Sequence, residues 1–159
     1  MKRLLGYFAV LILSAVACAP IFAQNDAIVG TWKMDAAKSK YTGVPAPKEL
    51  TRTVEASGDS YKYTYSGTAA DGSSISYGFT VKYDGKDYPS TGSAPGGFDM
   101  IAIKRVNSHE YTATQKKGGK VMGTAKVVIS KDGKVSTITV KGTGEDGKAM
   151  SYTSVYEKQ

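Results

Sequence analysis

Apolar and polar residues alternate with a period of two through most of the sequence from Leu50 onward. Because successive side chains of a strand point to opposite faces, such alternation predicts strands that are buried on one face. No window after the first 23 residues shows sustained helical periodicity, and residues 34–40 could form at most one helical turn. The apolar series comprise Tyr61, Tyr63 and Tyr65; Ile75, Tyr77, Phe79, Val81 and Tyr83; Val121, Gly123, Ala125, Val127 and Ile129; and Met150, Tyr152, Ser154 and Tyr156.

Turn signals separate these predicted strands at short intervals. In a two-residue hairpin turn both positions must tolerate positive φ, which Asp-Gly pairs do well. The Pro- and Gly-rich stretch 89–97 predicts one longer connection. Closure of the resulting meander would remove its exposed edges, whereas a two-sheet sandwich would need longer crossovers. We therefore expect an all-β fold, a single antiparallel up-and-down β-barrel of eight to ten strands, with Asp-Gly turns at Asp71-Gly72, Asp84-Gly85, Asp132-Gly133 and Asp146-Gly147.

The first segment has the layout of a secretory signal peptide. Lys2 and Arg3 precede an apolar run, residues 4–17, that is too short to span a bilayer comfortably. Pro20 ends this run, and Ala23 supplies a small residue before the expected cleavage point.

Residues 1–23 are therefore predicted to be a signal peptide and residues 24–159 the barrel domain. This predicts a periplasmic or secreted bacterial protein that has no stable membrane insertion after cleavage. Two alternatives remain: an uncleaved membrane anchor, and a lipoprotein attached through Cys18, which follows a faint lipoprotein-box pattern.

The composition argues against several kinds of chemistry. One His and one Cys exclude a His/Cys metal cluster, a disulfide framework and a Cys–His catalytic pair. His109 falls in a predicted turn, where we expect it to be solvated. Residues 142–147 match Gly-x-Gly-x-x-Gly, but a strand pattern follows them, and a dinucleotide site needs a helix there. We therefore expect no catalytic residues, no metal and no cofactor, and a protein that is not an enzyme.

Both ends of the predicted domain resemble the calycin superfamily. Gly30-Thr31-Trp32 at the start is similar to the opening of lipocalins and fatty-acid-binding proteins, and residues 155–158 are similar to the end of the latter. The whole domain, with residues 83–89 as a typical stretch, resembles small secreted bacterial lipocalin-like proteins of unassigned function. The resemblance implies that Gly30 and Trp32 close the base of the barrel, where the first and last strands meet.

The sequence also departs from these families. Fatty-acid-binding proteins place an Arg two residues before the final Tyr to hold a ligand carboxylate, and Ser154 stands there, although Tyr156 remains. Residues 36–48 are too short for the helical pair of that family. Lipocalins lay a late-strand Arg over the Trp; residues 24–159 contain only Arg52 and Arg105, and a Lys could substitute.

The tyrosines carry the functional hypothesis. Ten of the 11 lie after residue 23, and rings with a polar tip suit an apolar cavity that orients a polar group. We expect non-catalytic carriage of a small hydrophobic molecule by a monomer, although the same rings could simply fill the barrel. Arg105 shares a face with Ile101 and Ile103, and if it points inward it needs an anionic partner, either a ligand carboxylate or a buried acid. The opposite phase of that segment is nearly as apolar. The candidate ligand-binding residues are Tyr63, Tyr65, Tyr77, Phe79 and Tyr152 as lining, with Arg105 or Tyr156 to orient a polar head.

A second hypothesis is an envelope or extracellular interaction module, similar to inhibitor-like calycins. Residues 104–141 hold nine Lys or Arg and two Asp or Glu, a basic stretch that could bind an anionic envelope partner. Contact would be made through the 115–120 tip and the 89–97 loop. The alternative is a solvated face whose lysines protect strand edges. No motif for nucleic acid appears, and we expect none to bind.

Overall fold

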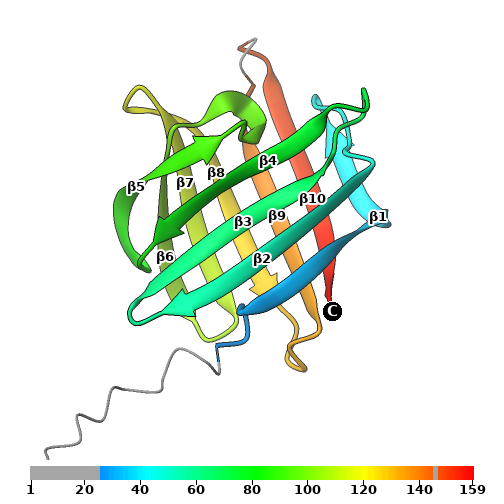
Figure 1. Cartoon of the computed structure of the whole chain (residues 1–159). Coiled ribbons are helices and arrows are strands. Elements are labelled where there is room, and N and C mark those ends of the chain that lie inside the picture. Colours follow the sequence, from blue (N-terminus) through cyan, green and yellow to red (C-terminus); the bar gives the residue numbers. More distant parts are fainter. Residues whose placement is uncertain (1–25, 145–146) are drawn as a thin grey trace, which may run out of the picture.

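A computed structural model describes residues 26–144 and 147–159 (Figure 1). The predicted signal peptide, including Cys18, and Asp146 of one predicted turn lie outside the described residues. The elements are β1 (Gly30–Thr42), β2 (Glu49–Ser57), β3 (Ser60–Thr68), β4 (Ser74–Val81), β5 (Asp84–Gly92), the short 3₁₀ helix η2 (Pro95–Gly97), β6 (Met100–Asn107), β7 (Glu110–Lys117), β8 (Lys120–Ile129), β9 (Val135–Thr143) and β10 (Ala149–Lys158).

The ten strands close into one antiparallel barrel in which each strand pairs with its neighbours in sequence. The ring is completed by β1, which pairs with β2 on one side and β10 on the other, so that Trp32 lies opposite both Arg52 and Lys158. The predicted all-β, up-and-down barrel is therefore confirmed, with the largest strand number in the expected range. Within the described residues, no helix is long and apolar enough to cross a membrane.

Alternating burial follows the sequence pattern closely. In β3, Tyr61, Tyr63 and Tyr65 are buried, while Lys62 and Thr64 between them are exposed. Strands β2, β7 and β9 repeat this order, and each contributes three buried side chains to the inside. A single inner face thus collects the side chains that surround the barrel axis.

The helical turn expected at residues 34–40 is absent, because this segment is a bulged part of β1. Asp35 pairs with Val155, and the next pair is Lys40 with Thr153, so β1 carries extra residues relative to β10. The Asp35 carboxylate accepts the backbone N–H groups of Ala37 and Lys38, which turns the bulge without a helix.

The Asp-Gly turns differ in type from the expectation. Among the described residues no side-chain-bearing residue has positive φ, so the glycine alone adopts it, as at Gly72 with φ 91°. The N–H of Gly72 donates to the carbonyl of Ala69, and the Asp71 carboxylate accepts the N–H of Ser73. These are turns in which a left-handed Gly follows the first bend. The predicted 89–97 loop is also shorter than expected, since residues 89–92 belong to β5.

Candidate functional site

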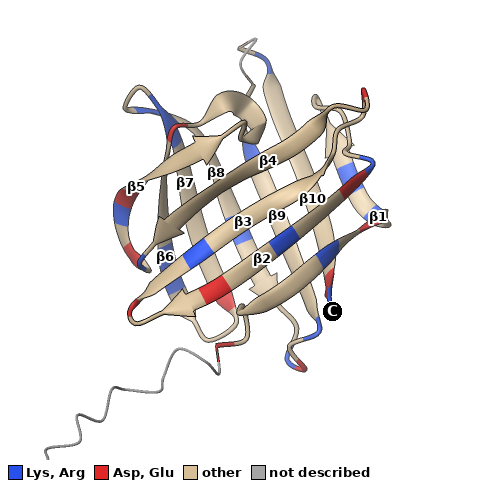
Figure 2. Ribbon diagram, in the orientation of Figure 1, with Lys and Arg blue, Asp and Glu red and all other residues tan. Residues whose placement is uncertain are grey.

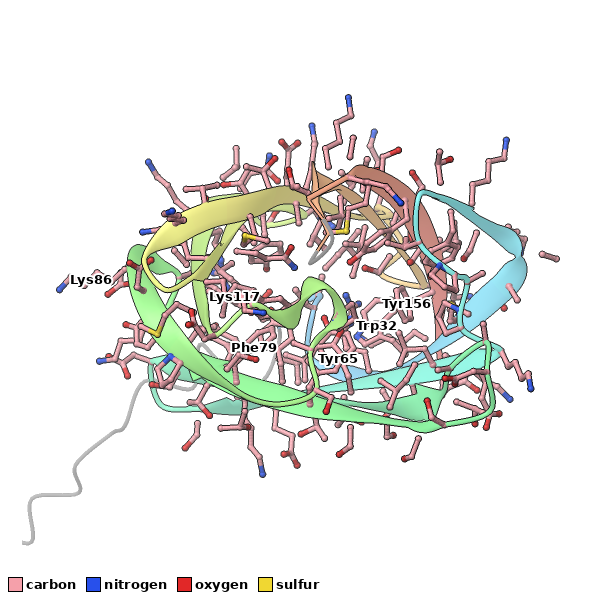
Figure 3. The ribbon with its side chains drawn as sticks, turned by 90° about the horizontal axis from the view of Figure 1, so that it is seen from above. Trp32, Tyr65, Phe79, Lys86, Lys117 and Tyr156 are labelled. Carbon is pink, nitrogen blue, oxygen red and sulfur yellow. The ribbon has the colours of Figure 1, made fainter. Side chains whose placement is uncertain are left out.

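The barrel encloses a cavity of about 480 Å³. Its mouth lies at the end where the β1–β2, β3–β4 and β5–β6 connections meet, and Pro45, Ala70 and Pro95 contribute to its rim. At the opposite end, Ile28 from the segment before β1 is 1% exposed and forms part of the floor. In the view along the barrel, Tyr65 and Phe79 lie inside the ring of strands, whereas Lys86 points away from it (Figure 3).

One wall of the cavity is aromatic because β3 and β4 place rings directly opposite each other. Tyr65 stacks on Tyr77 with centroids 4.4 Å apart and planes 6° from parallel, and Tyr63 stacks on Phe79 at 4.8 Å. The facing wall is mainly aliphatic, with Ile101, Ile103, Val127, Ile138 and Val140. Six of the predicted ligand-binding residues line this cavity: Tyr63, Tyr65, Tyr77, Phe79, Tyr152 and Tyr156.

The phenol groups that line the cavity are held in the neutral form. Burial raises the pKa of Tyr65, Tyr77 and Tyr156, and the nearby positive charge of Arg52 opposes that shift in each case. The cavity also carries a polar pair on its side, where the Tyr41 hydroxyl lies 2.6 Å from the Ser154 hydroxyl. The lining is therefore apolar over most of its area, with neutral hydroxyl groups at separate points.

Arg52 is a charged cavity residue that was not predicted from the sequence. Its side chain is fully buried and lines the cavity, with the guanidinium carbon 5.1 Å from the Trp32 ring centroid and 4.9 Å from that of Tyr156. Its Nε and Nη2 atoms have no hydrogen-bond acceptor among the described residues. The signal was present in the sequence, because Arg52 occupies the same strand phase as the apolar residues Leu50 and Val54.

Arg105 does not line the cavity, contrary to the expectation that it orients a ligand. It follows Ile101 and Ile103 in phase, but it lies near the end of β6, where the register with β7 shifts. Its guanidinium forms an ion pair with Asp26, whose side chain is 5% exposed. The Asp26 carboxylate is therefore the anionic partner of Arg105, and this ion pair lies at the closed end of the barrel.

The closed end is organised around Trp32, which is fully buried and is not among the cavity-lining residues. Its indole N–H donates to the Ile28 carbonyl at 2.8 Å, and the Lys158 ammonium lies 5.0 Å from the ring centroid. Burial lowers the pKa of Lys158, and the charge of Arg52 adds to this. Gly30 has φ 130°, and a Cβ there would lie 2.8 Å from the Lys158 Cε.

Within the Gly-x-Gly-x-x-Gly stretch, Gly142 allows close strand packing, and Gly147 adopts a positive φ of 77°. Gly142 lies in β9 opposite Gly123 of β8, and a Cβ at Gly142 would lie 2.3 Å from the Met122 carbonyl oxygen. Ala149 begins β10, so this stretch joins two strands. Among residues 26–144 and 147–159, no three His, Cys, Asp or Glu side chains gather where they could hold a metal ion.

The basic stretch 104–141 is distributed over several strands. Figure 2 shows Lys and Arg on strands around the barrel and in loops at both ends. Several of these charges are locally paired, such as Lys116 with Asp87 at 2.7 Å and Lys126 with Glu110 at 2.9 Å. Gln115, placed at the edge of the predicted contact tip, is buried and lines the cavity instead.

A closed antiparallel barrel whose first and last strands meet beside a buried Trp has the calycin fold. A crystal structure of the zebrafish ileal bile acid-binding protein complexed with cholic acid is similar, at 15% identity and a TM-score of 0.51, covering 84% of this chain and 99% of that one. As-p18, an extracellular fatty acid binding protein, matches at 14% identity and a TM-score of 0.50, covering 84% and 97%. The sequence matches no family model and no curated protein significantly, so the likeness is one of fold.

Proposed function

We propose that this protein binds and carries a small, mainly hydrophobic molecule inside its barrel, without catalysis. The observation that carries the proposal is the cavity of about 480 Å³, which is lined mainly by aromatic and aliphatic side chains. Small-molecule sites are typically of this size and are mostly apolar, with a few polar groups that fix orientation. The two similar structures, one of them complexed with cholic acid and the other named as a fatty acid binding protein, support a ligand of this class.

The site of action belongs to the same proposal. The charged start, apolar run and small residue of segment 1–23 support export to the periplasm or the outside of the cell. Amino-terminal sequencing of the exported protein tests this. We expect the exported protein to begin at Gln24. A lipidated protein that begins at Cys18 would indicate a membrane-anchored lipoprotein instead. An uncleaved protein in the cytoplasm would contradict export.

Titration with a neutral fluorescent probe, 1-aminoanthracene, tests binding inside the barrel. We expect one probe per chain, with increased emission. Ala125 lines the cavity, and the neighbouring Thr124 is exposed, so the two positions give a matched pair. Ala125→Trp fills the cavity and should abolish binding, whereas Thr124→Trp should leave it unchanged. Equal binding by both folded variants, or no binding to the unmodified protein, would contradict the proposal.

A further inference from the structure

We infer that the ligand carries an anionic head group, of the carboxylate class, which Arg52 takes at the floor of the cavity. This inference rests on the proposed function and names the chemical class of its ligand. The apolar part of the molecule would then lie between the aromatic and aliphatic walls and extend toward the mouth.

Arg52 is a buried cation without an ion-pair partner among the described residues. Arg52 is fully buried, and no ion pair joins it to an Asp or Glu in the described parts of the chain. A charge removed from water is destabilising unless it is paired and hydrogen-bonded. The rings of Trp32 and Tyr156 offset part of this cost through their faces, and the Tyr65 hydroxyl is a hydrogen-bond partner, but Nε and Nη2 have no acceptor among the described residues.

The geometry around the guanidinium of Arg52 also fits a carboxylate. Two aromatic rings lie close to the guanidinium carbon, so its remaining bonding capacity lies at the edge of its plane. Nε and Nη2 lack acceptors among the described residues, and these two atoms form the edge that matches the two oxygens of a carboxylate. A single anionic head would neutralise the charge and satisfy both nitrogen atoms together.

Arg105 differs from Arg52 in having an acidic partner within the protein. These are the two arginines of residues 24–159. Arg105 has its own carboxylate, Asp26, which also accepts hydrogen bonds from Tyr61 and Tyr111. The fold therefore supplies an acid for the arginine at the closed end, whereas the described neighbours of Arg52 in the cavity are neutral phenols.

A matched pair of fluorescent ligands tests the inference, namely 11-(dansylamino)undecanoic acid and its methyl ester. The acid should bind roughly 10- to 100-fold more tightly than the ester, which is the range expected for hydrogen bonds to a charged group. Arg52→Met should remove this preference while keeping the affinity for the ester. Arg105→Met, which removes the same charge outside the cavity, should leave the acid-to-ester ratio unchanged.

The outcomes separate the inference from the proposed function. If the acid and the ester bind the unmodified protein equally, the anionic head is wrong and carriage of an apolar molecule stands. If neither ligand binds, the proposed function fails together with the inference. Should Arg52→Met not fold, Arg52→Lys and the ratio in the unmodified protein decide, because a lysine keeps the charge but loses the two-point geometry and should retain only part of the preference.

Discussion

The guanidinium of Arg52 in β2 lies beside the indole ring of Trp32 in β1, with 5.1 Å between the guanidinium carbon and the ring centroid. The two residues are directly opposite in the β1–β2 register, and the Arg52 guanidinium also lies 4.9 Å from the ring of Tyr156 in β10, the strand that closes the barrel on β1. Among the described residues, Arg52 is the only Lys or Arg that lines the cavity. Barrel closure and the floor of the candidate site therefore depend on the same side chain.

Removal of one ring from the aromatic wall should weaken ligand binding. Tyr77 stacks on Tyr65 and lines the cavity, so Tyr77→Ala removes both the contact surface and the ring that orients its neighbour. We predict roughly 10-fold weaker binding of 1-aminoanthracene, as expected for the loss of one buried aromatic contact. Tyr88→Ala provides the matched control, because Tyr88 does not line the cavity. Unchanged affinity of a folded Tyr77→Ala protein would contradict the assignment of this wall.

Removing either partner of the Asp26–Arg105 ion pair should lower the stability of the fold, but by different amounts. Asp26 is 5% exposed and Arg105 is 38% exposed, so an unpaired Asp26 is the more costly of the two. Arg105→Met should lower the free energy of unfolding by about 1–3 kcal/mol, and Asp26→Asn by less, because water can solvate the remaining guanidinium. Urea denaturation measures both variants. A larger loss for Asp26→Asn than for Arg105→Met would be the opposite of this prediction.

The buried phenols should make the fold sensitive to alkaline pH. Burial raises the pKa of all ten described tyrosines above 10.0, the value for an unfolded chain. The unfolded chain therefore releases protons first, so this contribution to stability is complete below pH 10 and is lost as the pH rises through the higher values of the folded state. Tyrosinate absorbance should rise late, and together with unfolding monitored by circular dichroism. Full ionisation near pH 10 with the fold intact would contradict the burial of these rings.

Close approach of β8 and β9 should make Gly142 intolerant of a side chain. A Cβ at this position would lie 2.3 Å from the Met122 carbonyl oxygen and 2.7 Å from the Gly123 Cα, both of which are backbone atoms. Gly142→Ala should therefore lower the free energy of unfolding by about 1–3 kcal/mol through overpacking. Thermal denaturation measures the effect. The comparison variant is Ser136→Ala, which shortens a buried side chain of the same strand. A Gly142→Ala protein as stable as the unmodified one would refute this strand contact.

The sequence was sufficient to predict much of the fold and part of the site. Alternation in β3 and β4 correctly placed Tyr63, Tyr65, Tyr77 and Phe79 on one inner face, because a period of two leaves a strand only two possible faces. The same alternation placed Arg52 between two buried residues, but an arginine is usually expected to reach water. Only the structure shows that the Arg52 side chain is fully buried and lines the cavity.

The predictions for Arg105 and for residues 34–40 differ from the structure because both depend on contacts that the local sequence pattern does not reveal. The partner of Arg105 is Asp26, which is 79 residues away in the sequence, and the phase of β6 says nothing about that pairing. The bulge in β1 depends on Asp35 capping the N–H groups that follow it, and a short polar stretch of this kind also fits a helical turn. Long-range partners and bulges therefore set the limit of what periodicity predicts here.

Native mass spectrometry of the protein recovered from its natural source, followed by denaturing extraction, tests whether the barrel carries a ligand. We predict one small, mainly apolar molecule per chain, and that molecule should carry an acidic head group if Arg52 acts as inferred. An unliganded mass, together with failure of the purified protein to bind 1-aminoanthracene, would contradict carriage in the barrel. A control carrier in the same preparation must keep its own ligand.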